Sequence, residues 1–123
     1  MPRVDILLVE SQPAALRLLA RIARRALGNA RIRTACTLAE GLEQAREAAQ
    51  LGLVVLDLEL PGCRRIDALM RFVMEFPLAK VVVVSGAEAD QHKPAALAAG
   101  AAAYVPKSAS PFSMAATLRN LHL

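Results

Sequence analysis

Short apolar runs alternate with amphipathic stretches along the whole chain. The apolar runs consist mostly of valine, leucine, isoleucine and alanine, and they predict β-strands at residues 4–9, 32–35, 53–56, 81–84 and 102–105. Helical spacing of apolar residues, together with prolines and capping residues at helix starts, predicts helices over residues 13–27, 37–50, 66–76, 94–99 and 111–121. The pattern therefore predicts five successive strand–helix units.

The predicted strands are almost continuously apolar, so both faces of the sheet are expected to be covered. Strands that alternate with helices pair in parallel through right-handed crossovers. No linker or change in composition divides the chain, and 123 residues suit one domain. We expect a single α/β domain over residues 1–123, with a doubly wound (βα)5 fold around a parallel five-stranded sheet.

Composition narrows the class of protein. Hydrophobic residues make up 55% of the chain, which is enough for a core, but no apolar stretch approaches the ~20 residues that span a bilayer. The N-terminus lacks the long apolar region of a signal peptide, so we expect a cytoplasmic protein without membrane contact. Cys36 and Cys63 are expected to be free thiols. They are too few for a zinc site, and His92 and His122 show no ligand spacing.

Positive charge is concentrated in the first 33 residues, which hold seven arginines against two acidic residues. Four of them, Arg17, Arg21, Arg24 and Arg25, fall on one face of the first predicted helix, opposite its apolar positions. Two interpretations remain open: a solvated outer face, or a docking surface for an acidic partner. Aromatic residues make up only 3% of the chain, so base stacking and direct nucleic-acid contact are not expected.

Polar residues follow the predicted strands. Glu10 comes after the first strand, Asp57 after the third, Ser85 after the fourth and Lys107 after the fifth. In a parallel sheet these positions meet at one edge, where such folds bind ligands. Two carboxylates suit Mg²⁺, and a carboxylate can also accept a phosphoryl group whose oxygens a hydroxyl and an ammonium would bind.

Four segments, at residues 6–10, 57–62, 84–87 and 104–108, read Ile-Leu-Leu-Val-Glu, Asp-Leu-Glu-Leu-Pro-Gly, Val-Ser-Gly-Ala and Tyr-Val-Pro-Lys-Ser. Their order and spacing resemble the response-regulator receiver domain of two-component signalling, the CheY-like family. The resemblance covers essentially the whole chain and implies the strand order 2-1-3-4-5. Gln12-Pro13 and Pro106-Lys107-Ser108 are most similar to receivers that precede a LuxR-type helix-turn-helix. This similarity implies a role in transcription regulation, and it leaves open whether a C-terminal DNA-binding domain follows these residues in a longer protein.

The resemblance also implies a role for each residue of the site. Asp57 would accept a phosphoryl group from a sensor histidine kinase or phosphotransfer protein, so the domain would be a phosphoacceptor and not an enzyme. Glu10, Asp57 and the backbone carbonyl of Glu59 would hold Mg²⁺. Ser85 and Lys107 would contact the phosphoryl oxygens. Tyr104 would turn inward with Ser85 and repack the face of the fourth helix, fifth strand and fifth helix, through which a homodimer is expected.

Two positions depart from the family pattern. Ser11 stands where a second acid is usual, and its neutral hydroxyl is a poorer Mg²⁺ ligand than a carboxylate. Ser108 follows the lysine where a proline after a cis peptide bond is usual, which makes a cis bond costly here. We expect weakened Mg²⁺ affinity and slow phosphorylation.

Three other functions are weighed against a phosphorylatable receiver. Ser11 favours a degenerate receiver that binds partner proteins without phosphorylation, whereas the Asp57 and Lys107 pair argues against it. A flavodoxin-like flavin protein would need a phosphate-binding loop after the first strand, which Glu10-Ser11-Gln12-Pro13 does not provide. A haloacid-dehalogenase-type phosphatase would carry its nucleophilic aspartate where this chain has Glu10.

Overall fold

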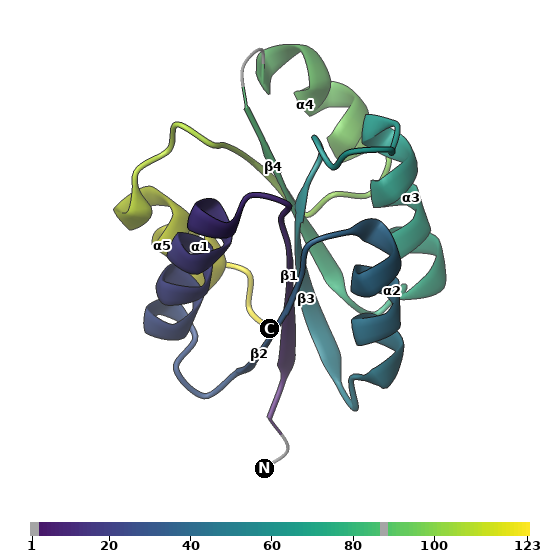
Figure 1. Cartoon of the computed structure of the whole chain (residues 1–123). Coiled ribbons are helices and arrows are strands. Elements are labelled where there is room, and N and C mark those ends of the chain that lie inside the picture. Colours follow the sequence, from purple (N-terminus) through teal and green to yellow (C-terminus); the bar gives the residue numbers. More distant parts are fainter. Residues whose placement is uncertain (1–2, 87–88) are drawn as a thin grey trace.

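The computed structural model describes residues 3–86 and 89–123. The described residues form an α/β fold in which strands and helices alternate as predicted, and all neighbouring strands are parallel (Figure 1). The strand order β2-β1-β3-β4-β5 is also the predicted one. In chain order the elements are β1 (Asp5–Val9), α1 (Pro13–Ala26), β2 (Arg31–Ala35), α2 (Leu38–Glu47), β3 (Leu51–Asp57), α3 (Arg65–Glu75), β4 (Lys80–Ser85), α4 (Ala89–Ala98), β5 (Ala103–Pro106) and α5 (Pro111–Arg119).

The sheet lies between two helical layers. Helices α1 and α5 cover one face, and α2, α3 and α4 cover the other (Figure 1). Alternate residues of the central strands enter two separate cores: Leu7 and Val54 pack on the α2–α3 side, whereas Leu8 and Val55 pack on the α1–α5 side. This double burial explains why the central strands are continuously apolar.

The register of the strands brings their carboxyl ends to one edge. Val9 pairs with Leu56 in β3, so that Glu10 and Asp57 each follow a paired position. Asp57 in turn pairs with Val84, the residue before Ser85. The fold therefore places the polar residues predicted from the sequence beside one another.

Local signals set several helix ends. The hydroxyl of Thr37 accepts a hydrogen bond from the Glu40 backbone N–H at 3.1 Å, and the Glu40 carboxylate accepts one from the Cys36 N–H. Thr37 is therefore the predicted cap of α2, and the Glu40 carboxylate holds the N–H of the residue before the cap, not that of Thr37 itself. Ser110 caps α5 in the same way, by accepting from the Ser113 N–H.

Two predicted helix boundaries are wrong. The fourth helix begins at Ala89, not at residue 94, and Pro94 is its sixth residue. A proline at that position removes one hydrogen bond to the preceding turn, but Ala96 is fully buried against the core, and this packing stabilises the helix. The second helix ends at Glu47, not near residue 50, because the backbone N–H of Gln50 donates to Asp5 and β3 begins directly afterwards.

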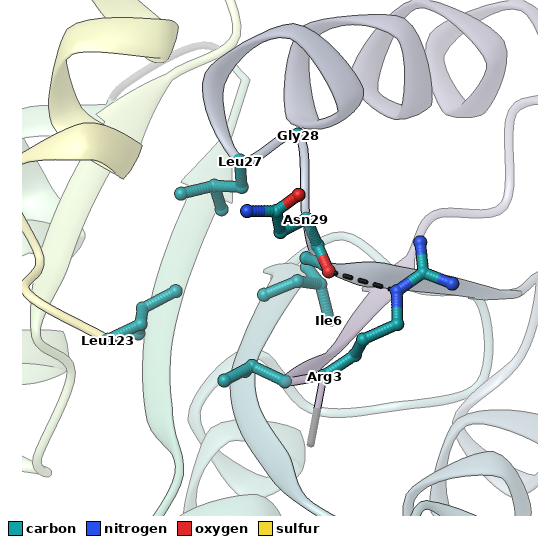
Figure 2. A pocket seen from close by; sticks show the side chains of 8 residues that line it. Arg3, Ile6, Leu27, Gly28, Asn29 and Leu123 are labelled. Carbon is teal, nitrogen blue, oxygen red and sulfur yellow. Dashed lines mark hydrogen bonds between the residues drawn. The ribbon is translucent and has the colours of Figure 1, made fainter. Parts of the chain in front are cut away.

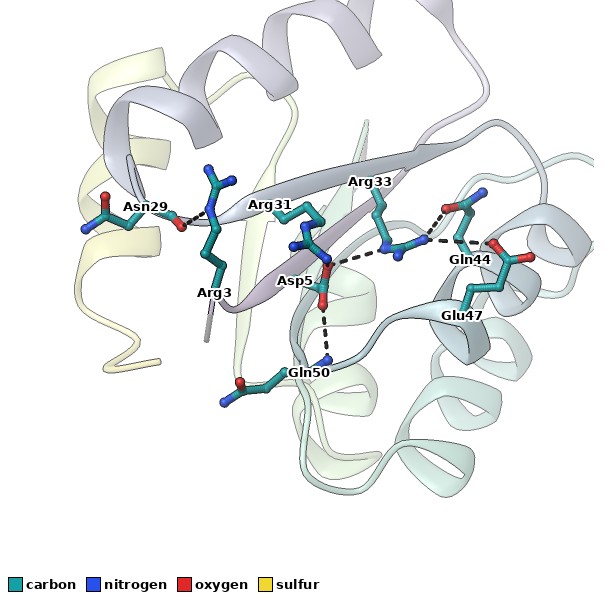
Figure 3. Close-up of polar contacts among 8 residues, drawn as sticks. All are labelled: Arg3, Asp5, Asn29, Arg31, Arg33, Gln44, Glu47 and Gln50. Carbon is teal, nitrogen blue, oxygen red and sulfur yellow. Dashed lines mark hydrogen bonds and ion pairs between the residues drawn. The ribbon is translucent and has the colours of Figure 1, made fainter. Parts of the chain in front are cut away.

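A buried carboxylate at the other end of the sheet has a complete set of partners (Figure 3). Asp5 is fully buried, and its oxygens accept hydrogen bonds from Arg33 Nε at 3.3 Å and from the Gln50 N–H at 3.0 Å. Arg31 adds an ion pair at 3.9 Å. Paired in this way, the charge is tolerated in the interior, and it ties β1 to β2 and to the start of β3.

Candidate functional site

Two buried carboxylates and one ammonium meet at the carboxyl end of the sheet. Glu10 and Asp57 are each 3% exposed. The Lys107 ammonium lies 3.1 Å from Glu10 Oε1 and 3.3 Å from Asp57 Oδ2. The lysine is brought into place because its backbone N–H donates to the Ser85 carbonyl at 2.7 Å, which extends the β4–β5 ladder by one residue. The single ammonium balances only one of the two carboxylates, so the site keeps a net negative charge.

The remaining carboxylate oxygens are held by backbone groups. Asp57 Oδ1 accepts from the Glu59 N–H at 2.8 Å, and Glu10 Oε2 accepts from the Gln12 N–H at 2.9 Å. These bonds orient both side chains toward Lys107. Glu10 therefore reaches into the site and is not a solvated loop residue.

The pKa values of Asp57 and Lys107 are both raised, but for different reasons. Burial raises the pKa of Asp57, and the negative charge of Glu10 raises it further, although the Glu59 N–H and Lys107 act in the opposite direction. Burial lowers the pKa of Lys107, but the hydrogen bond to Glu10 and the charges of Asp57 and Glu10 outweigh this effect and hold the pKa above its ordinary value. Lys107 therefore stays protonated. Its single positive charge compensates only part of the negative charge of Asp57 and Glu10.

Two buried hydroxyls lack hydrogen-bond partners among the residues that the structure describes. They are the Oγ of Ser85, a fully buried residue, and the hydroxyl oxygen of Tyr104. Buried polar groups are normally paired, so each of these hydroxyls is a donor that lacks an acceptor in this arrangement. The Tyr104 ring packs against the α2–α3 core, and its hydroxyl is already buried in this structure.

The Glu59 side chain makes a contact that sequence reasoning missed. Its Oε1 accepts from the Gly86 N–H at 3.1 Å. A Cβ at Gly86 would lie 2.9 Å from both carboxylate oxygens of Glu59, so the absence of a side chain there allows the close approach. No local pattern signals this contact, because it joins loops that are 27 residues apart in the chain.

The donor set suits a hard cation only in part. Glu10 and Asp57 offer carboxylate oxygens, which are the ligands that Mg²⁺ prefers. Among the described residues, however, no group of three His, Cys, Asp or Glu side chains is arranged to hold a metal. Position 11, directly after Glu10, is a serine. No peptide bond between described residues is cis, so the bond before Ser108 is trans.

Hollows elsewhere on the surface do not include the two carboxylates together. A hollow of about 620 Å³ lies at the opposite end of the sheet, between Arg3, Leu27 and Leu123 (Figure 2). A smaller groove of about 120 Å³ runs from Glu10 and Lys107 between α1 and α5. That groove reaches Glu10 and Lys107 but does not include Asp57 among its lining residues. In the part of the chain that the structure describes, Cys63 and His122 make no hydrogen bond or ion pair with Glu10, Asp57 or Lys107.

No helix among the described residues is long and apolar enough to cross a membrane.

A match to a protein-family model identifies the family to which this chain belongs. The model of the response regulator receiver domain matches residues 6–119. The chain belongs to this family. Receiver domains in general accept phosphoryl groups, bind Mg²⁺ at the phosphorylation site, interact with histidine kinases or phosphotransfer proteins, and often dimerise. The predicted family and fold are thus confirmed.

Individual relatives agree with the family model. A curated relative from Bacillus subtilis (strain 168), the uncharacterized transcriptional regulatory protein YhcZ, is 34% identical over 86 residues, which are 68% of this chain and 40% of that protein. The chain therefore matches less than half the length of this relative.

Solved receiver structures show the same fold. A CheY-like receiver domain protein from Methanospirillum hungatei JF-1 is 24% identical, with a TM-score of 0.84 over 96% of this chain and 92% of that one. A LuxR-family two-component response regulator from Aurantimonas sp. SI85-9A1 is 26% identical, with a TM-score of 0.82 over 95% of this chain and 83% of that one.

Proposed function

We propose that this receiver domain is switched by phosphorylation of Asp57. The observation that carries the proposal is the juxtaposition of a buried Asp57 short of positive charge, a cationic Lys107 at 3.3 Å and an unpartnered Ser85 hydroxyl. In the proposed reaction a carboxylate oxygen of Asp57 attacks the phosphorus of a phosphohistidine. The P–N bond breaks as the P–O bond forms, and the imidazole leaves with the electron pair and is protonated from solvent.

Lys107 and Ser85 would stabilise the product. The ammonium neutralises negative charge that the phosphoryl oxygens bring into the site, and the Ser85 hydroxyl gains the acceptor that it lacks in the unphosphorylated protein. Drawing Ser85 toward the phosphoryl group would free space beside Tyr104 and repack the α4–β5–α5 face. This two-state change at a charge event is the proposed switch, with a homodimer through that face as its output.

Glu10, Asp57 and the backbone carbonyl of Glu59 are the residues that would hold Mg²⁺. The ion would supply charge neutralisation for the incoming phosphoryl group. Because Ser11 contributes no charge, the affinity for Mg²⁺ and the rate of phosphorylation are expected to be lower than with a carboxylate at that position.

The experiment is phosphorylation by a small phosphoryl donor with and without Mg²⁺, followed by mass spectrometry of the intact protein and its peptides. The expected result is slow, Mg²⁺-dependent addition of one phosphoryl group at Asp57, absent in Asp57→Asn. A matched control is Asp67→Asn, which removes an exposed acid on α3. Absence of modification in the wild-type protein, with both a small donor and a cognate kinase, would contradict the proposal.

A second candidate function is a protein-interaction module that works without phosphorylation. Ser11 is the specific observation that favours it, because the site lacks a third carboxylate. Partner binding that is identical for the wild-type protein and Asp57→Asn would support this alternative.

The cellular setting of the domain is a further part of the proposal. We propose that the protein acts in the cytoplasm as the input domain of a transcription regulator, with its donor a sensor histidine kinase or phosphotransfer protein. The transcriptional relative supports this setting. Each Asp57 would carry one phosphoryl group at a time, and only slow hydrolysis would remove that group. The domain would therefore be a signalling acceptor and not an enzyme.

A further inference from the structure

One face of α1 carries four exposed arginines. We define the arginine row as Arg17, Arg21, Arg24 and Arg25. These residues line a hollow of about 480 Å³ between α1 and β2, together with Leu16, Ala20 and Thr34. Within the described part of the chain, the structure gives the arginine row no ion pair. Four positive charges are therefore gathered at the surface without a counter-charge.

The two helical layers of the protein differ in charge. Helices α1 and α5 cover one face of the sheet (Figure 1) and contain the arginine row and Arg119, but no acidic residue. The acidic residues of the described helices are all in α2, α3 and α4, which cover the opposite face. They are Glu40, Glu43, Glu47, Asp67, Glu75 and Asp90. The α1–α5 layer is therefore a positively charged side of the molecule.

The spacing of the arginine row makes its members repel one another. Arg21 has another arginine four residues before it, three residues after it and four residues after it, so all four are neighbours on the helix surface. Like charges at these spacings destabilise a helix. An anion that contacts several of the arginines at once would remove this repulsion. The row is therefore suited to a ligand with several closely spaced negative charges.

We propose that the arginine row binds the phosphate backbone of duplex DNA without reading its base sequence. A guanidinium group binds phosphate oxygens through two parallel hydrogen bonds. From Arg17 to Arg25 the row extends over about 12 Å of helix at 1.5 Å per residue, and duplex DNA carries one negative charge per about 1.7 Å of its axis. About three or four phosphate contacts are therefore within reach of the row.

The surroundings of the row favour a nucleic acid over an acidic protein. Interfaces between proteins have an apolar centre, often with aromatic anchors, whereas protein–DNA interfaces are more polar and much more positively charged. Besides the arginines, the hollow is lined by the half-buried Leu16, the buried Ala20 and Thr34, so it presents no large exposed apolar side chain. The exposed Leu18 instead lines the groove between α1 and α5. The row is thus a charged surface without an apolar anchor.

Membranes and single-stranded nucleic acids fit the row less well. An interfacial membrane helix inserts its apolar face into the lipid, but Leu19, Ala20 and Ala23 of α1 are buried in the core beneath the helix. Single strands are held largely by stacking on aromatic side chains, and the residues that line the hollow include none. Contacts to a duplex backbone need neither feature, so the low aromatic content of the chain does not argue against them.

Binding of the unphosphorylated protein to a fluorescently labelled DNA duplex of mixed sequence, followed by anisotropy, is the measurement. At about 50 mM salt we expect a dissociation constant of about 10–100 µM. The logarithm of the binding constant should fall with the logarithm of the salt concentration with a slope of about −3, which is about −0.9 for each phosphate contact. A duplex of unrelated sequence should bind equally well.

Matched variants test the assignment to the arginine row. Arg21→Gln/Arg24→Gln should bind the duplex at least tenfold more weakly and reduce the magnitude of the salt slope by about 2, because two phosphate contacts are lost. Arg21→Lys/Arg24→Lys keeps both charges and should bind within about threefold of the wild type. The control Arg64→Gln/Arg71→Gln removes the same net charge from two exposed arginines of the opposite layer, and it should leave binding nearly unchanged. Circular dichroism checks that each variant folds.

The inference goes beyond the proposed phosphorylation and does not depend on it. Asp57→Asn should bind duplex DNA as the wild type does, because Asp57 does not line the hollow beside the arginine row. Failure of phosphorylation would therefore leave DNA binding unaffected, and failure of DNA binding would leave the phosphorylation proposal unaffected.

Absence of duplex binding by the wild-type protein at low salt, up to several hundred micromolar, would overturn the proposal. Equal weakening in Arg21→Gln/Arg24→Gln and in Arg64→Gln/Arg71→Gln would also overturn it, because net charge alone would then explain the binding. Tighter binding to poly-glutamate than to the duplex, lost in Arg21→Gln/Arg24→Gln, would overturn it and would assign the arginine row to an acidic protein. Binding to vesicles of anionic phospholipid without binding to the duplex would overturn it in favour of a membrane.

Discussion

Two buried aspartates, one at each end of the sheet, have opposite surroundings. Asp5 at the amino end accepts hydrogen bonds from Arg33 and from a backbone N–H, and has a second arginine nearby. Asp57 at the carboxyl end also accepts from a backbone N–H, that of Glu59, but it shares the Lys107 ammonium with a second carboxylate, Glu10. The Ser85 hydroxyl, one residue beyond the partner of Asp57 in β4, is unpartnered. Burial alone therefore does not mark a functional acid. A carboxylate with complete partners stabilises the fold, whereas an undercompensated one is available to a ligand.

The largest effect is expected from removing the charge at the carboxyl end. Asp57→Asn should abolish phosphoryl uptake from any donor, because an amide cannot form the acyl phosphate. Asp5→Asn should take up phosphoryl groups at the wild-type rate as long as it is folded. Intact-mass spectrometry after incubation with donor and Mg²⁺ measures both. Equal loss of uptake in the two folded variants would remove the distinction between the two aspartates.

Stability is expected to respond in the reverse order. Asp5→Asn should lower the free energy of unfolding by about 2–3 kcal/mol, because it leaves the partly buried Arg33 with only Gln44 and a loose contact with Glu47 as partners. Urea denaturation monitored by circular dichroism measures this change, with Asp67→Asn as the exposed control. A loss no larger than that of the control would show that the network around Asp5 contributes little.

Restoring a carboxylate sharpens the comparison at the active end. Ser11→Asp should raise Mg²⁺ affinity by about tenfold or more, because a third charged oxygen ligand joins Glu10 and Asp57. Without metal the same variant should be less stable than the wild type, since a further negative charge enters an undercompensated site. Calorimetric titration with Mg²⁺ and thermal denaturation with and without the ion test the two effects. Unchanged affinity would mean that position 11 does not reach the metal.

The smallest effect concerns pH. The pKa of Asp57 is raised in the fold, so its charged form is disfavoured there, and the cost is fully present above that pKa and is lost as pH falls through it. Asp57→Asn should therefore have a higher Tm than the wild type at pH 7 without Mg²⁺, because the amide carries no charge to be disfavoured by burial and by Glu10. The difference should shrink as pH falls toward 4. Thermal melts across this range measure it, and a difference that grows at low pH would contradict the assignment.

Much of the fold could be predicted because its signals are local. Apolar runs and helix starts lie within a few residues of the elements that they specify, and the capping of α2 by Thr37 is one example. The start of α4 could not be predicted, because Pro94 suggests a helix start on its own and only the burial of Ala96 against the sheet shows that the helix begins earlier.

The sequence also predicted which polar residues meet at the candidate site, but not all of their contacts. The positions of Glu10, Asp57, Ser85 and Lys107 after successive strands predicted that they would meet at one edge, and the fold brings them there. The contact between Glu59 and Gly86 and the partners of Asp5 could not be predicted, because each joins residues far apart in the chain and depends on side-chain orientation.

The sequence by itself determined the five strand–helix units, their parallel pairing and the edge at which the chemistry gathers, because hydrophobic periodicity and strand direction are local properties. Only the tertiary structure decided which buried charges are compensated and which are not. That balance depends on distances between residues brought together from different strands and loops, as with Lys107 between Glu10 and Asp57, and on how much water the surrounding elements exclude.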